Sequence, residues 1–295
     1  MFAYIAIAIS IAFILIVALN PSFHIFSSIF IDTSLASDFG SFIGGVLSPI
    51  LSIISIVLLI MSIKKQTTET RKNEFKTHIY ELLKYNRDTV SELEYQPSNE
   101  INKQVEIGSR FFIYSKRQIE KAATAVGLLF PSLQPIKIYQ LAYLIFYFGS
   151  SLESKETLKK HLKEIISESD AEKLINNIRE KRTRYDNAIQ YYGGHQNRLG
   201  CYFRQLYHLI HSIDTEIILN DIEKQRYIKM IRVQLGDYEQ ALLFYNSLTT
   251  LGSAWAIEVA QNKSLITRYE LIKNIQDGFL EFKHFKAVYP DIAYE

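Results

Sequence analysis

The residues best suited to chemistry are concentrated in one stretch, YYGGHQNRLGCYFRQLYHLIH at 191–211. It holds three histidines, two arginines and Cys201, which is the only cysteine of the chain. Imidazole, guanidinium and thiol groups at helical spacing suit either acid–base chemistry or a buried hydrogen-bond network. A metal site at His195, His208 and His211 is not predicted, because no second cysteine stands with them at ligand spacing.

One pair in this stretch supports a catalytic hypothesis. Arg204 and His211, with six residues between them, resemble the Arg/His pair of the helical HEPN ribonucleases. In that arrangement the cation binds phosphate and the histidine serves in acid–base chemistry or substrate positioning. Such a pair also arises by chance in a chain with seven histidines. The sequence has no phosphate-binding glycine loop, Gly-x-Ser-x-Gly or His-Glu metalloprotease motif, so neither an enzyme nor a cofactor is expected.

The alternative hypothesis gives the same stretch a structural and sensing role in a helical domain. Arginine, tyrosine and histidine at helical spacing are typical of polar networks, because a guanidinium has five donors that need partners. This is the role we expect, including contact with a partner around Arg198 and Arg204. The residues assigned to it are His195, Gln196, Arg198, Tyr202, Arg204 and Tyr207.

A helix predicted at 196–213 positions these side chains. Its apolar residues recur at intervals of three and four, which predicts a buried stripe. The stripe consists of Leu199, Phe203, Leu206 and Ile210. Gly193 and Gly194 end the preceding helix, and Asn197 is predicted to cap this one.

The surrounding sequence also has helical periodicity and lacks sustained alternation, so the domain is predicted to be all-α. Helices are expected at 102–126, 136–149, 155–166, 170–190, 221–248 and 264–277, with a short apolar helix at 254–261. Ser154 and Ser169 are predicted N-caps, the second forming a capping box with Glu172. The apolar window IYQLAYLIFYF at 138–148 is too short to cross a bilayer and predicts a core helix.

The first 63 residues have the composition of membrane segments. No lysine or arginine precedes Lys64, and Asp32 and Asp38 are the only acidic residues before it. Two uncharged windows, at 2–19 and 40–63, approach or exceed the roughly 20 residues that cross a bilayer. A cleaved signal peptide is the alternative for the first window, but it lacks a basic start and a cleavage motif.

The charges that follow the second window predict the orientation. Lys64, Lys65, Arg71 and Lys72 come directly after it, whereas the loop at 20–39 has no basic residue. By the positive-inside rule, both termini are expected to be cytoplasmic. A single cysteine agrees with a reducing cytosol.

The predicted organisation is a two-helix transmembrane hairpin at 1–63, a helical stalk at 64–96 and a cytoplasmic α-helical domain at 97–295. The stalk keeps one apolar face, which packs on its own domain or, alternatively, forms a coiled coil between chains. That face consists of Phe75, Ile79, Leu82, Val90 and Leu93.

The second window also carries small residues along one helix face. Small residues let helices approach closely in lipid, where the hydrophobic effect does not drive association. The stripe serves either as the seam of one hairpin or as a contact between copies in a homo-oligomer. Its members are Ser41, Gly45, Ser48, Ser52, Ser55 and Ser62.

Several stretches resemble the phage abortive infection family of AbiC-like bacterial proteins. They are FGSFIGGVLSPILS at 39–52, RFFIY at 110–114, GHQNRLGCYFRQLYHLI at 194–210, YIKMIRVQLGDYEQALLFYNSL at 227–248 and LITRYELIKNI at 265–275. Cys201 departs from the histidine that is common at its position in the family. The resemblance implies an effector, or toxin, of the bacterial inner membrane that acts in antiviral defence by abortive infection.

Similar two-span effectors accompany retrons, which implies a retron reverse transcriptase with its DNA–RNA product as a partner. The lipid bilayer is the other expected partner. Acidic and basic residues interleave in segments such as KETLKKHLKE at 155–164. That pattern is typical of a solvated helix surface, so no tight binding of bare nucleic acid is expected.

Overall fold

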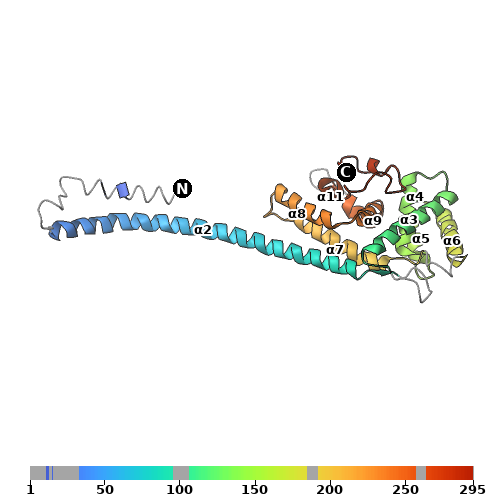
Figure 1. The fold of residues 1–295 in the computed structure, drawn as a ribbon, viewed down its shortest axis with the longest axis horizontal. Helices are drawn as coiled ribbons and strands as arrows, with labels where there is room; N and C mark the ends of the chain where they lie inside the picture. Colours follow the sequence, from blue (N-terminus) through green and yellow to red (C-terminus); the bar gives the residue numbers. More distant parts are fainter. Residues whose placement is uncertain are drawn as a thin grey trace. The chain divides into compact units, whose positions relative to one another are not determined.

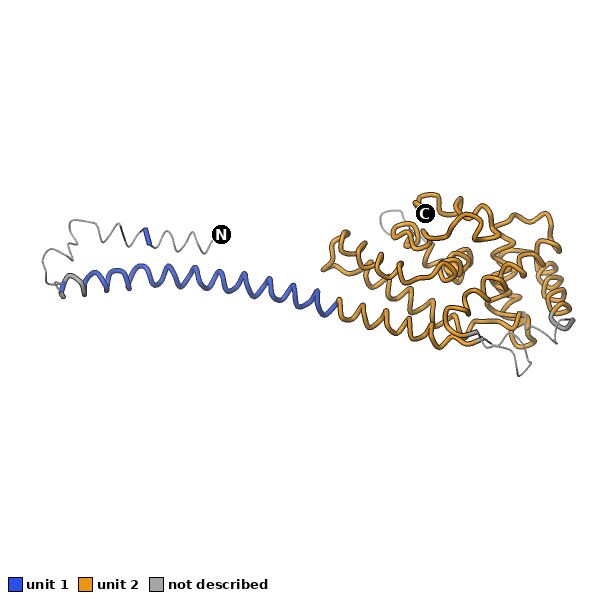
Figure 2. The backbone as a smooth tube through the Cα atoms, in the orientation of Figure 1, with its two compact units in different colours: residues 1–75 blue, residues 76–295 orange. Residues whose placement is uncertain are grey.

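The computed structural model describes residues 11–12, 15, 33–95, 106–184, 192–256 and 264–294 of the chain. Regular structure in these residues is helical (Figure 1), apart from one two-residue antiparallel pair, β1 (Glu94–Tyr95) with β2 (Glu106–Ile107). The all-α prediction is therefore confirmed for the described part of the chain. Figure 2 colours the two compact units into which the chain divides, residues 1–75 and 76–295.

Helix α2 (Thr33–Ser91) has 59 residues and contains Pro49. Its portion Ser37–Ser91 is the one described helix that is long and apolar enough to cross a membrane, judged by length and composition alone. The hydroxyls of Ser52 and Ser55 donate to carbonyl oxygens one turn earlier, each at 2.8 Å. These serines therefore satisfy their hydroxyl protons without water, as serines within a bilayer must.

The predicted first span at 2–19 lies almost wholly outside the described residues. Among the residues that are described, there is one long apolar helix and not a two-helix hairpin. The hairpin stays a prediction, because its first span cannot be assessed in the described residues. The span at 2–19 and the orientation of the termini are taken up again below as proposals.

The last turns of α2 belong to the second compact unit, which begins at Lys76. Ile79, Leu83 and Val90 are buried there, as is Leu93 just beyond the helix. The structure places Leu83 on the buried face and leaves Leu82 partly exposed. The predicted stalk at 64–96 is thus divided, and its second part packs on its own domain.

The core of the second unit lies where α3 (Ser109–Leu129), α4 (Pro135–Phe148) and α9 (Asp237–Ser247) pack together. The predicted core window is confirmed, because every side chain from 141 to 148 is buried. Around this core lie α5 (Lys155–Leu162), α6 (Glu168–Arg184), α7 (Gln196–Thr215) and α8 (Asp221–Gln234). Shorter elements follow: η2 (Thr250–Gly252), α10 (Ser253–Ala256), α11 (Leu265–Tyr269) and η3 (Phe285–Ala287).

Three predicted helices end differently in the structure. The helix expected at 221–248 is two helices, because Gly236 is extended and its amide donates to the Glu239 carboxylate at 3.0 Å. The helix expected at 264–277 ends at Tyr269, because Glu270 adopts a left-handed conformation with φ of 49°. The helix expected at 254–261 is described only as α10, and its remainder lies outside the described residues, as do residues 185–190.

The starts of α6 and α3 and the cap of α5 also differ from the prediction. Helix α6 begins at Glu168, and Ser167, not Ser169, accepts the amide of Asp170 at 3.2 Å. Ser154 stands at the N-cap position of α5, but its hydroxyl donates to the carbonyl oxygen of Gly149 at 3.0 Å. Helix α3 begins at Ser109, later than the expected residue 102.

Candidate functional site

Residues 192–195, which lead into α7, lie across the end of α4 and are joined to it by backbone hydrogen bonds. The amide of Ser150 donates to the carbonyl of Tyr192 at 2.9 Å, and the amide of His195 donates to the carbonyl of Tyr147 at 2.8 Å. Gly149 and Gly194 have φ of 76° and 85°, a region that side chains with a Cβ rarely adopt. We call these two residues the glycine crossing, and it fixes the entry of the chain into α7.

Helix α7 begins at Gln196, two residues earlier than it would with Asn197 as its N-cap. His195 occupies the N-cap position, and its carbonyl already accepts the amide of Leu199 at 2.9 Å. Asn197 lies inside the first turn, so its prediction as the cap is wrong. The glycine crossing sets the boundary, because it turns the backbone into the helix directly after Gly194.

His195 is an enclosed anchor between α7 and the core. Its side chain is 1% exposed, and its Nε2 lies 3.1 Å from Oε1 of Gln118 on α3. The ring packs on Phe146 and Phe111, with centroids 4.6 and 5.4 Å away. Burial, together with the charge of Arg198, lowers the pKa of His195 to about 3. The ring is therefore neutral at physiological pH and donates its Nε2 proton to the amide oxygen of Gln118.

This burial predicts loss of stability in mild acid. The pKa of His195 is lowered from its ordinary 6.5 to about 3 in the folded chain, so the unfolded chain binds the proton first. The contribution of the neutral His195 ring to the free energy of unfolding is complete above pH 6.5. It falls by about 1.4 kcal/mol per pH unit as the pH is lowered toward 3. We expect the melting temperature of the detergent-solubilised full chain to drop between about pH 7.5 and about pH 5.

His195→Gln is the control for this prediction, because glutamine has no group that titrates in this window. Its melting temperature should be lower than that of the natural chain at neutral pH but should change less between the two pH values. Equal pH dependence of the two proteins would assign the loss to other groups.

The faces of α7 follow the predicted periodicity. The stripe of Leu199, Phe203, Leu206 and Ile210 is buried, as is Tyr202, which is 0% exposed. Gln196, Arg198 and Arg204 are exposed. Tyr207 packs edge-on against Trp255 at 5.2 Å between centroids. The six residues of the structural and sensing motif therefore divide between a buried set and a solvent-facing set.

Arg204 and His211 do not meet. Seven residues along a helix span about 10 Å. Arg204 reaches back over Gly200, where a Cβ would lie 3.3 Å both from its Nη1 and from the hydroxyl of Tyr147. His211 stacks on Tyr207 with centroids 5.3 Å apart. Among the described residues no hydrogen bond or ion pair joins the pair, and no group of three metal-binding side chains is present.

The solvent-facing side of the motif lines an open polar hollow of about 370 Å³. Gln196, Asn197 and Arg198 line it together with Ser151, Glu153 and Ser154. The hollow therefore carries both signs of charge. It suits contact with another polar surface better than capture of a bare anion.

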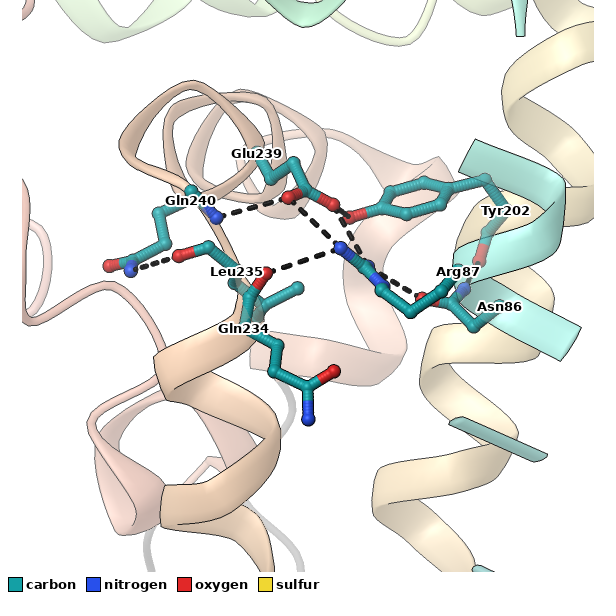
Figure 3. A network of polar contacts seen from close by, with 8 residues as sticks. Asn86, Arg87, Tyr202, Gln234, Leu235, Glu239 and Gln240 are labelled. Carbon is teal, nitrogen blue, oxygen red and sulfur yellow. Dashed lines mark hydrogen bonds and ion pairs between the residues drawn. The ribbon is translucent and has the colours of Figure 1, made fainter. Parts of the chain in front are cut away.

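A second polar centre, which the sequence did not predict, joins α2 to α7 and to the corner between α8 and α9 (Figure 3). Arg87 binds both carboxylate oxygens of Glu239, Nη2 to Oε1 at 2.9 Å and Nη1 to Oε2 at 3.2 Å. Its Nη1 also donates to the carbonyl of Gln234 at 3.2 Å. Tyr202 donates its hydroxyl to Glu239 at 3.0 Å, and the Asn86 amide donates to the Tyr202 carbonyl at 3.3 Å. We call these five residues the arginine clamp.

The clamp is charged and largely shielded from water. Glu239 is 5% exposed and Tyr202 is 0% exposed. Burial lowers the pKa of Arg87, but the hydrogen bond and charge of Glu239 outweigh it, so the net pKa lies above its ordinary value. Burial, reinforced by Glu239, raises the pKa of Tyr202 well above its ordinary value. The phenol therefore keeps its proton and remains a donor.

The described residues define a class of protein, namely a compact helical domain entered by one long helix whose earlier part is apolar and exposed. Residues 194–280 match the family described as "Putative phage abortive infection protein". The match confirms the AbiC-like family resemblance and supports a phage-defence role for the chain. It covers less than a third of the sequence, from Gly194 of the glycine crossing to beyond α11. Neither curated proteins nor solved structures gave a match.

Proposed function

We propose that this chain is a membrane-anchored effector of abortive infection. Residues 2–19 and 40–63 form two spans in the bacterial inner membrane, with both termini in the cytoplasm. The helical domain receives the signal of infection, and the spans of several copies associate and compromise the membrane. The observation that carries the proposal is a phage-defence family match in the same chain as an exposed, apolar helix.

The exposed side chains of α2 support the membrane part of this proposal. Eleven large apolar residues between Phe42 and Ile63 are 36% to 63% exposed, and so continuous an exposed apolar surface is unusual for a helix in water. Basic residues begin at Lys64, at the point where the apolar run ends. This order is typical of a span with its C-terminal flank in the cytoplasm.

The small-residue stripe supports the proposed association. All six of its members are exposed on a continuous helix, and a Cβ on Gly45 would meet no described atom within 4 Å. Helices in lipid approach closely along such faces. A homo-oligomer built on this stripe is the assembly that we propose for the active state.

The trigger reaches the protein through the helical domain. A retron reverse transcriptase carrying its DNA–RNA product is a fitting partner that would hold the effector inactive in uninfected cells. We expect the contact to be made through protein, since the exposed charges of α5 and α6 pair with one another, as Lys159 does with Glu168 and Glu172.

Substitutions in the alternative nuclease pair test this proposal. His211→Ala is expected to retain protection against phage, because His211 belongs neither to the membrane segment nor to the structural and sensing motif. Arg204→Ala alone does not decide, because Arg204 belongs to that motif. Plaque counts on cells that carry each variant, compared with the natural chain and an empty vector, give the measurement. Loss of protection by both variants at normal protein levels would favour a tethered ribonuclease and contradict the membrane mechanism.

A further inference from the structure

We propose that the arginine clamp is an autoinhibitory contact. It holds the cytoplasmic end of α2 in the inactive state, and displacement of the corner between α8 and α9 releases it. The inference rests on the proposed function in one respect, because it takes the released state to be the toxic one. It concerns residues 76–295 alone, where every contact of the clamp lies.

The clamp ties α2 to both sides of one corner. Arg87 donates to the carbonyl of Gln234, the last residue of α8. It also binds Glu239, whose Oε2 accepts the amide of Gly236 and so caps α9. The same carboxylate therefore serves the corner and the guanidinium. A shift of the corner that withdraws Glu239 and the Gln234 carbonyl leaves Arg87 only the side-chain oxygen of Asn86, to which its Nη2 donates at 2.8 Å.

The chemistry of the clamp favours two discrete states over gradual loosening. A shielded ion pair is weak evidence for stability, because apolar side chains of similar volume often replace one without loss. Separating the partners, however, leaves a charge without compensation. Arg87 also has a buried Nε without a hydrogen-bond partner among the described residues. The closed clamp is thus not an optimised network, which suits a contact that has to open.

Helix α8 is the element best placed to move. Of its 14 residues only Ile228 and Ile231 are buried, whereas α9 buries nine of its 11 residues. Its side chains Ile222 and Val233 are 66% and 75% exposed. Elements with few buried contacts open at the lowest free-energy cost and are the ones recruited as switches. A partner that draws α8 aside would first remove the Gln234 carbonyl from Arg87 and then strain the corner at Gly236, whose amide Glu239 accepts.

Helix α8 is itself hydrogen-bonded to residues 268–270, at the end of α11. Arg232 donates to the carbonyls of Tyr269 and Glu270 at 3.2 and 3.4 Å, and Gln225 donates to the carbonyl of Arg268 at 3.1 Å. Displacement of α8 would carry this segment along with it. All of these residues lie within 194–280, so the region that matches the family contains the switch, and α2 receives its output.

Arg87→Met in the full-length chain tests the proposal, because it removes the charge and keeps much of the side-chain volume. We expect growth arrest in the absence of phage, with viable counts on the order of 100-fold lower than for the natural chain at equal membrane levels. Lys116→Met is the matched control. It breaks the ion pair with Glu120, which lies within α3 and outside the corner, and the side chains of that pair are similarly shielded, 13% and 9% exposed against 26% and 7% for Arg87 and Glu239.

Normal growth of the Arg87→Met strain at normal protein levels would overturn the proposal. Equal toxicity of Lys116→Met would also overturn it, because general loosening of a shielded ion pair would then suffice. If Arg87→Met fails to accumulate, Tyr202→Phe decides, since it removes one hydrogen bond to Glu239 and keeps the ring. Growth arrest of this variant without phage supports the clamp, and unaltered growth rejects it.

A membrane-potential dye in the same cultures separates the two proposals, because arrest with an intact potential rejects membrane breach and leaves the clamp standing.

Discussion

Alanine at Gly194 is expected to prevent the chain from accumulating as folded protein. Gly194 has φ of 85°, and a Cβ there would overlap the carbonyl of Phe148, which is backbone and has no rotamer with which to yield. The strained backbone conformation alone costs about 1–2 kcal/mol. Because the two backbone segments must also move apart, we expect the free energy of unfolding to fall by about 4 kcal/mol or more. That is a large part of the stability of a typical domain.

The neighbouring residue gives a matched control. A Cβ on Gly193 would meet no atom within 4 Å, and its φ lies outside the left-handed region. Gly193→Ala should therefore be tolerated, with a melting temperature close to that of the natural chain. The two variants are compared by their abundance in the membrane fraction and by their thermal unfolding in detergent. Similar behaviour of the two would show that the glycine crossing does not constrain the domain.

Leucine at Gly45 is expected to abolish protection without removing the protein from the membrane. The substitution adds bulk on the proposed contact face, and leucine itself partitions well into lipid. Within the described chain the new side chain has room, because no atom lies within 4 Å of a Cβ at this position. Loss of activity would therefore point to a second helix that packs there. Plaque counts and chemical crosslinking on the same strain give the measurement.

Gly44→Leu is the control for this substitution. It adds the same side chain one residue away, off the small-residue stripe, and also has free space around it. We expect Gly44→Leu to keep its crosslinked species and its protection. Persistence of both in Gly45→Leu would mean that the stripe is only the seam of a single hairpin, and the assembly model would lose its main support.

The sequence predicted those features that depend on local periodicity. The buried stripe of α7 and the core position of α4 follow from the spacing of apolar residues, and both are confirmed. The split between α8 and α9 was missed because apolar residues continue past Gly236 at helical spacing. The sequence does contain a signal there, since a glycine followed three residues later by a glutamate allows Glu239 to accept the amide of Gly236, which is half of a capping box.

The arginine clamp could not be predicted from one sequence. Arg87 and Glu239 are 152 residues apart, and no local pattern indicates that they pair. Burial of Asn86 beside Ile79, Leu83 and Val90 marks a polar residue on an apolar face, which is the one local sign of a network. The roles of Tyr202 and His195 depend on the same kind of long-range contact, because each finds its partner on another helix.

The central claim is that the chain protects by acting on the membrane, and the membrane potential during infection tests it most directly. Cells that carry the natural chain, the Gly45→Leu variant or an empty vector are infected at high multiplicity and followed with a potential-sensitive dye. We predict that the potential collapses before lysis in cells with the natural chain and is kept over the same interval in the other two. Growth arrest of cells with the natural chain while their potential stays intact would contradict the account.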